Sequence, residues 1–259
     1  MNISLPHLPQ RCKQPRSNGI TMVMDKGMSI RQLEDFIEAS SEYVDFVKLG
    51  FGTSVITKNL NKKIKLLKGA NLKPYFGGTL FETFVIRGMF DEYVSFVDKH
   101  HIEVIEVSDG EIKINHDKKC EYIHKLSKNY TVISEVGSKE EDVIIHPNMW
   151  IKMMNKELEA GSWKVIAESR ESGTVGIYHN SGNTHTLLVK KIIANVNSEK
   201  IIWEAPKKSQ QAWWIKLLGA NVNLGNIAPE EVIPLETLRL GLRGDTFFTF
   251  LPKELSRKI

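Results

Sequence analysis

The chain has 259 residues, of which 41% are hydrophobic and 25% are charged, and its formal net charge is +4. This length and composition fit a globular protein with a large apolar core and exclude a disordered or disulfide-stapled chain. Charges of both signs are mixed without a block of like charges, so we expect no nucleic-acid partner. The mild positive balance would suit an anionic small molecule, although net charge alone favours an ordinary surface.

The chain carries no sign of export or of a membrane segment. Its two cysteines, Cys12 and Cys120, are far apart and form no metal or redox motif, so we expect free thiols in a reducing compartment. The first residues lack a charged region followed by an apolar one, and we expect no signal peptide. No apolar run approaches the ~18 residues that span a bilayer. We therefore predict a cytoplasmic protein with no membrane segment.

Short β-branched, apolar runs recur along the chain, as is typical of buried strands. The polar residues that end these runs lie about 28 residues apart on average, close to the ~30 of one unit of strand and helix. The expected strands, in chain order, are Ile20–Met24, Val44–Leu49, Leu72–Phe76, Val104–Val107, Tyr130–Ser134, Lys164–Ala167, Lys200–Trp203 and Asn221–Leu224.

Between these runs the apolar period becomes helical. Ser29 precedes the first apolar stripe and Gln32 follows three residues later, which predicts a capping box. Connections are short except around Ser172–Thr186, a stretch rich in Gly, Ser and Asn whose length suggests a functional loop. Helical stripes are expected within Ile30–Ile37, Leu60–Leu67, Phe90–Val97, Ile123–Leu126, Trp150–Leu158, Leu187–Ile193 and Val232–Leu242.

Eight consecutive units of strand and helix predict an α/β fold, a single (β/α)8 TIM barrel over residues 17–259. Residues 1–16 are expected to be a short N-terminal extension near the barrel floor. The rival architecture, an open doubly wound sheet, usually shows a Gly-rich dinucleotide turn after its first strand. Here that turn is Asp25-Lys26-Gly27, and neither GxGxxG nor GxxxxGK[ST] occurs.

Four glutamates end four consecutive strands: Glu106, Glu135, Glu168 and Glu204. A carboxylate at the end of a buried strand is costly unless something pairs or ligates it, and the strand ends of a barrel meet at one mouth. Each acid alone could be an ion-pair partner, but four together leave two answers, a divalent cation or the basic residues nearby. Mg²⁺ takes one or two carboxylates, which leaves the other acids to basic side chains. Scattered histidines argue against zinc.

Basic residues lie at the same strand ends. Lys48 falls inside a buried run, so it must point into the barrel mouth or be paired. Lys26 and Lys139 follow the first and fifth strands, where a lysine can hold phosphate, neutralise a carboxylate or donate a proton. Arg170 follows the sixth strand and can clamp a carboxylate or phosphate. A structural ion pair is the alternative for each.

Turns at two further strand ends could approach a ligand. Gly78 and Thr79 follow the third strand, where glycine allows close backbone contact. Asn223, Gly225 and Asn226 follow the expected eighth strand, and the loops after strands seven and eight hold phosphate in many barrels. A plain tight turn is the alternative at both places.

Ten short strings, most of them at strand ends, occur in order along the chain. They are Lys13–Arg16, Asp25–Gly27, Asp45–Ser54, Gly77–Glu82, Glu106–Gly110, Ser134–Lys139, Glu168–Gly173, Glu204–Pro206, Val222–Ile227 and Leu235–Arg243. Together they resemble the phosphosulfolactate synthase family, the sulfite-adding enzymes of coenzyme M biosynthesis, which have bacterial and plant relatives. The resemblance runs from about Lys13 to Thr246, with one small departure, Ser169 in place of alanine.

The resemblance implies a lyase that needs Mg²⁺ and adds sulfite to phosphoenolpyruvate, giving (2R)-phospho-3-sulfolactate. It implies that Lys139 protonates C2, with Lys48 as second choice, and that Arg170 assists with the substrate's anions. The metal ligands it implies are Glu106, Glu135, Glu168 and Glu204. The substrate-binding positions it implies are Lys26, Gly78, Thr79, Ser108, Asn223, Gly225 and Asn226.

Two other functions stay open at this point. One is a different TIM-barrel enzyme that acts on another phosphorylated three-carbon acid or sugar, because barrels host many chemistries. The other is a non-catalytic, stress-associated binding protein, although polar residues at nearly every strand end argue against lost catalysis. Trp213 and Trp214 are either core residues or an interface of a homo-oligomer.

Overall fold

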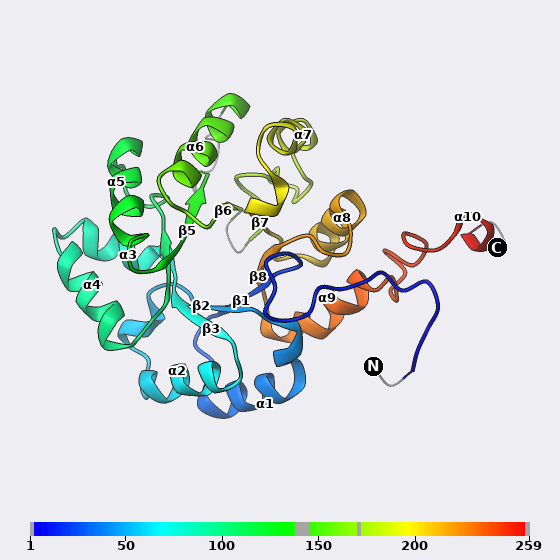
Figure 1. Cartoon of the computed structure of the whole chain (residues 1–259), viewed down its shortest axis with the longest axis horizontal. Helices are drawn as coiled ribbons and strands as arrows, with labels where there is room; N and C mark the ends of the chain where they lie inside the picture. The colour runs from blue at the N-terminus through cyan, green and yellow to red at the C-terminus, as the bar shows by residue number, and fades with distance from the viewer. Residues whose placement is uncertain (1–2, 138–145, 170–171, 257–259) are drawn as a thin grey trace.

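The computed structural model describes residues 3–137, 146–169 and 172–256. Eight parallel strands pair in chain order and close into a barrel, with helices around it (Figure 1), so the predicted TIM barrel is confirmed. The strands are β1 Thr21–Asp25, β2 Phe46–Leu49, β3 Lys73–Phe76, β4 Val104–Val107, β5 Thr131–Val136, β6 Lys164–Ala167, β7 Ile201–Glu204 and β8 Leu224–Ile227.

Seven helices coincide with the expected apolar stripes, whereas the helices at 78–85, 208–218 and 253–256 were not among those stripes. The predicted capping box of Ser29 and Gln32 opens the first of them. Short 3-10 turns occur at 41–43, 53–55, 198–200 and 229–231. The helices are α1 Ile30–Ser40, α2 Leu60–Gly69, α3 Gly78–Val85, α4 Phe90–Lys99, α5 His116–Leu126, α6 Pro147–Glu159, α7 Thr186–Asn195, α8 Lys208–Leu218, α9 Val232–Arg239 and α10 Lys253–Ser256.

The eighth strand is the one that the sequence pattern placed wrongly. We expected Asn221–Leu224, but β8 begins at Leu224 and contains Gly225 and Asn226, two residues that are rare in strands. Asn226 has a left-handed φ of 56°, and the pairing of β8 with β1 shifts register there. A Cβ on Gly225 would lie 2.6 Å from Met22 Cε and 3.1 Å from Ile202 Cγ2, so glycine leaves room for these two side chains inside the barrel.

The period of two along each strand explains how charged groups reach the barrel mouth. Phe46, Val104, Ile133, Ile166 and Ile202 are buried members of one apolar cluster. Side chains two positions apart on a strand point to the same face, so the residues two positions later also point inward. Those residues are Lys48, Glu106, Glu135, Glu168 and Glu204.

The N-terminal segment contacts the opposite end of the barrel. Arg16 Nε lies 2.8 Å from Asp45 Oδ1, and Asp45 accepts a hydrogen bond from the backbone of Thr21 at the start of β1. Arg11 donates to Glu236 on α9 at 2.8 Å and to the carbonyl of Gly19. These contacts hold the segment at the amino-terminal ends of the strands.

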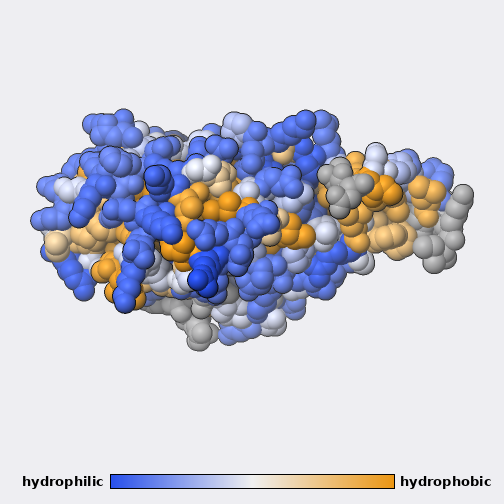
Figure 2. Space-filling model, turned by 90° about the horizontal axis from the view of Figure 1, so that it is seen from below, coloured by the Kyte–Doolittle hydropathy of each residue, from blue (hydrophilic) through white to orange (hydrophobic). Residues whose placement is uncertain are grey.

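The two chain ends project together to one side of the barrel (Figure 1). Figure 2 shows that apolar residues cover much of this projection, and Ile3, Phe247 and Phe248 are exposed.

Trp214 is buried and stacks on Trp203 with ring centroids 4.0 Å apart, so it belongs to the core. The homo-oligomer stays a prediction. None of the helices in the described ranges is both long and apolar enough to cross a membrane.

The close approach at Gly225 gives a stability prediction. Gly225→Ala should lower the free energy of unfolding by about 1–3 kcal/mol, because the new methyl group would overlap Met22 and crowd Ile202. Gly69→Ala is the matched control, since nothing lies within 4 Å of its added Cβ. Urea unfolding of both variants measures the difference, and equal stabilities would contradict the packing role of Gly225.

Candidate active site at the barrel mouth

Lys48 lies at the centre of the charged cluster. Its Nζ is 2.9 Å from Glu106 Oε1, 3.6 Å from Glu135 Oε2 and 3.8 Å from Glu204 Oε1. Burial alone would lower the pKa of Lys48, but these carboxylates outweigh burial and raise it well above its ordinary value. The raised pKa favours the charged form of Lys48 in this arrangement and makes it a weaker acid, which argues against the proton-donor role.

Glu106 serves as the anchor of Lys48. Its Oε1 also accepts a hydrogen bond from the backbone N–H of Gly78 at 2.5 Å, and its Oε2 accepts one from the Tyr75 hydroxyl at 3.0 Å. Both oxygens are thus engaged by protein donors. This geometry does not support the expected metal-ligand role of Glu106, because a metal would have to displace one of these donors.

The other three glutamates converge on one point. Oxygens of Glu135, Glu168 and Glu204 all lie within 4.8 Å of one another, and all three residues are buried. Glu204 Oε2 accepts a hydrogen bond from Ser169 N–H at 2.9 Å. Its Oε1 is buried and has no hydrogen-bond partner among the described residues. Hard oxygen donors arranged in this way fit a Mg²⁺ ion.

Burial raises the pKa of Glu204 to about 7, with help from the charges of Glu135 and Glu106. Lys48 and the Ser169 N–H act in the opposite direction. A carboxyl group that titrates near neutrality is one that lacks a full counter-charge in the protein itself. A raised pKa is also expected of a carboxylate whose charge a bound cation would balance, when that cation is absent.

Gly78 and Ser108 shape the site through contacts within the protein. A Cβ on Gly78 would lie 2.2 Å from Ser108 Oγ, so glycine lets α3 begin directly against β4. Ser108 is buried and donates a hydrogen bond to Glu82 on α3. Glu82 in turn accepts from the backbone N–H groups of Glu111 and Ile112. This geometry indicates that Ser108 holds the loop after β4 in place, and it does not support the expected contact between Ser108 and substrate. Thr79 is half-buried in the first turn of α3.

We expected Asn223, Gly225 and Asn226 to form one phosphate-binding turn after the eighth strand. Because β8 spans Leu224–Ile227, these residues lie in different places. Asn223 precedes β8, so placing it at the mouth was wrong. Its side chain accepts from the Ile20 N–H and donates to the carbonyls of Glu199 and Ile201, at the floor. Gly225 is packed inside the barrel. Asn226, buried near the end of β8, stays a candidate.

The remaining basic candidates differ in how far the structure describes them. Lys26 is exposed just after β1, and its Nζ lies 6.0 Å from the centroid of the Phe51 ring in the loop after β2. Lys139 and Arg170 lie outside the described residues. Lys26 stays a candidate for binding substrate anions.

Two features of the site were missed by sequence reasoning. Tyr75 holds Glu106, and the alternation along β3 could have indicated its inward direction. Tyr178, in the long loop after β6, donates to the Glu204 carbonyl at 2.7 Å and accepts from Trp214 at 2.7 Å. No local signal marks the contact between Tyr178 and Glu204, because these residues are 26 positions apart.

The fold and the site define a TIM-barrel enzyme whose acids and lysine meet at the carboxyl-terminal mouth. A family model described as (2R)-phospho-3-sulfolactate synthase matches residues 9–245. The chain belongs to this family.

Curated relatives support the same assignment over all or nearly all of their lengths. The phosphosulfolactate synthase of Bacillus subtilis is 41% identical over 251 residues, which cover 96% of this chain and 100% of the relative. The phosphosulfolactate synthase of Methanothermobacter thermautotrophicus is 41% identical over 244 residues, covering 92% of this chain and 95% of the relative.

Solved structures show likeness in fold alone. A 3-hexulose-6-phosphate synthase from Salmonella typhimurium has a TM-score of 0.54 at 12% identity, covering 86% of this chain and 100% of its own. An aldolase from Escherichia coli K12 has a TM-score of 0.55 at 11% identity, covering 83% and 76%. Both cover most of the barrel.

The raised pKa of Glu204 predicts how stability depends on pH in metal-free protein. Between pH 4.5 and about 7 the unfolded chain loses the Glu204 proton while the folded chain keeps it, so the wild type loses stability. The stability advantage of Glu204→Gln over the wild type should grow across this window and level off above it. Urea unfolding in chelator at several pH values measures it, and a pH-independent difference would contradict the assignment.

Proposed function

We propose that this chain catalyses the Mg²⁺-dependent addition of sulfite to phosphoenolpyruvate, giving (2R)-phospho-3-sulfolactate. The observation that carries the proposal is the set of three buried glutamates beside Lys48, in a chain 41% identical to a full-length phosphosulfolactate synthase. In the reaction the sulfite sulfur bonds to C3, the C2–C3 double bond is lost, and C2 gains a proton. Negative charge moves onto the substrate carboxylate before that proton arrives.

Glu135, Glu168 and Glu204 would hold the metal ion. Their convergence and the buried Oε1 of Glu204 support this set over one that includes Glu106. Bound Mg²⁺ would supply stabilisation of the negative charge that develops on the substrate.

Lys48 would contribute a fixed positive charge beside the reacting carbon atoms. Because Glu106 pairs with Lys48 and is itself held by Tyr75 and Gly78, the cation would need little reorganisation as charge develops. Lys26 and Arg170 would bind the substrate's phosphate and carboxylate, and Asn226 would lie beside the phosphate.

Lys139 would deliver the proton to one face of C2, which sets the (2R) configuration. This role rests on the family string after β5, since Lys139 lies outside the described residues. Lys139→Ala should abolish formation of the product while circular dichroism stays unchanged. Product formation followed by ³¹P NMR tests this, and retained turnover would transfer the role to another group.

An omission assay tests the proposed reaction directly. Purified protein with phosphoenolpyruvate, sulfite and Mg²⁺ should form phosphosulfolactate, and removal of any one component should stop it. Replacing sulfite by other nucleophiles, and phosphoenolpyruvate by other phosphorylated three-carbon acids, separates this reaction from another TIM-barrel chemistry. Turnover without sulfite would overturn the proposal.

The division of the four acids predicts different metal titrations. Glu135→Gln and Glu168→Gln should raise the Mg²⁺ concentration for half-maximal activity by at least about tenfold, the size typical of disturbing a metal's surroundings. Glu106→Gln should leave that midpoint unchanged while lowering kcat, because it loosens Lys48. The opposite pattern would make Glu106 a ligand.

Lys48→Met should lower kcat/KM by about 10²–10³-fold, because a preorganised charge in the site is lost. Lys63→Met is the matched control: Lys63 is equally buried and lies 2.5 Å from Asp25, so its loss also breaks a buried ion pair. Steady-state kinetics and thermal melting of both variants separate the two effects. Equal losses of activity would reduce Lys48 to a structural residue.

A further inference from the structure

The backbone beside the converging glutamates is held by groups from outside the sheet. The carbonyl of Glu168 accepts a hydrogen bond from the Ile177 N–H at 3.2 Å, and the carbonyl of Glu204 accepts one from the Tyr178 hydroxyl at 2.7 Å. Both donors lie in the long loop after β6. A donor that fixes the carbonyl of a residue limits where its carboxylate can lie, as groups behind a metal ligand commonly do.

Glu135, the third converging glutamate, is held by a buried lysine. The Nζ of Lys119 on α5 donates a hydrogen bond to the Glu135 carbonyl near the end of β5. Lys119 is 0% exposed, and its Nζ also lies 2.8 Å from Asp109 Oδ1 in the loop after β4 and 2.8 Å from Glu157 Oε1 on α6. Three acceptors match the three N–H bonds of the ammonium group, so its direction is fixed.

The charge of Lys119 strengthens its contact with the Glu135 carbonyl. Burial alone would lower the pKa of Lys119, but the carboxylates of Glu157 and Asp109 outweigh burial and raise this pKa above its ordinary value. A charged donor makes a stronger hydrogen bond than a neutral one. The end of β5 is therefore attached to a cation that α5, α6 and the loop after β4 keep in place.

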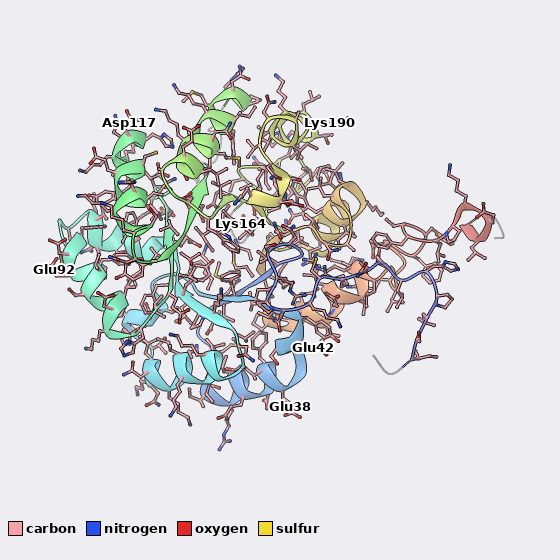
Figure 3. The ribbon with its side chains drawn as sticks, in the orientation of Figure 1. Glu38, Glu42, Glu92, Asp117, Lys164 and Lys190 are labelled. Carbon is pink, nitrogen blue, oxygen red and sulfur yellow. The ribbon has the colours of Figure 1, made fainter. Side chains whose placement is uncertain are left out.

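Two ion pairs join α5 to α6, and they lie on different sides of the helices. In Figure 3 Asp117 lies on the outer side of the ring of helices, where it is exposed and pairs with Lys156 Nζ at 3.0 Å. Lys119 is two residues later on α5, and residues two apart on a helix do not face the same way. Of these two pairs, the buried one between Lys119 and Glu157 is the one that also reaches a strand end of the barrel.

We propose that Lys119 is a positioning residue of the metal site, which holds the backbone of Glu135 so that its carboxylate meets those of Glu168 and Glu204. Lys119 contacts neither metal nor substrate in this role. The inference rests on the proposed function, in which these three acids bind Mg²⁺. Without Lys119 the end of β5 loses a charged donor, and the Glu135 carboxylate would spend less time in the position that completes the site.

Calorimetric titration of the metal-free, full-length protein with Mg²⁺ tests the proposal without turnover. Lys119→Met should weaken Mg²⁺ binding by about 10–100-fold, the size typical of losing a group behind a metal ligand. The KM for phosphoenolpyruvate at saturating Mg²⁺ should stay unchanged, because Lys119 acts through the metal site. Lys164→Met is the matched control and should bind Mg²⁺ like the wild type. Lys164 is 2% exposed and also donates to a backbone carbonyl, that of Glu199, but it does so at the start of β6.

A second variant keeps the test valid where Lys119→Met folds poorly because Glu157 is left as an unpaired buried charge. Lys119→Met combined with Glu157→Leu removes the whole pair, a change that buried pairs often tolerate. This double variant should show the same loss of Mg²⁺ affinity, and thermal melting confirms that it is folded.

The outcomes separate the positioning role from the proposed function. Wild-type Mg²⁺ affinity in folded Lys119→Met or in the double variant would overturn the positioning role and leave the metal site in place. Equal losses in Lys119→Met and Lys164→Met would overturn it too, because any buried lysine would then have the same effect. A wild type that binds no Mg²⁺ would overturn the metal site itself and the positioning role with it.

Discussion

The structure of the barrel mouth depends on the contact between Lys48 and the carboxylates around it. Four glutamates point into one end of a closed barrel, where water cannot fully solvate them, and such a cluster is unstable without compensation. Lys48 lies within 4 Å of three of the four. Its position is set in turn by Glu106, which the Tyr75 hydroxyl and the Gly78 N–H hold from neighbouring elements.

This arrangement assigns different tasks to acids that look equivalent. Glu106 uses both oxygens on protein donors, whereas Glu135, Glu168 and Glu204 converge. The last of these is steadied from the long loop after β6, where Tyr178 contacts its backbone carbonyl. Tyr178 can therefore influence the position of Glu204 through its backbone, without a contact to its carboxylate.

The pKa values of two buried lysines shift in opposite directions at the two ends of the barrel. At the mouth, opposite charges are brought together and the pKa of Lys48 rises. At the floor, Lys164 has a carbonyl and an aromatic ring as neighbours, and its pKa falls. Burial lowers the pKa of both lysines, and only at the mouth do neighbouring carboxylates reverse this effect and keep the lysine charged.

The sequence by itself determined the eight units, the closed barrel, the family and the ring of glutamates. Period-two alternation in buried runs is a local property, and it carries Lys48, Glu135 and Glu204 to the inner face without any knowledge of their neighbours. The pattern misplaced the eighth strand because Gly225 and Asn226 have low strand propensity. Gly225 serves close packing, and Asn226 adopts a left-handed backbone conformation. Only the tertiary structure separated Glu106 from the three converging glutamates, placed Asn223 at the floor and showed the hydrogen bond from Ser108 to Glu82. Those distinctions rest on contacts between residues far apart in the chain, and no local pattern encodes them.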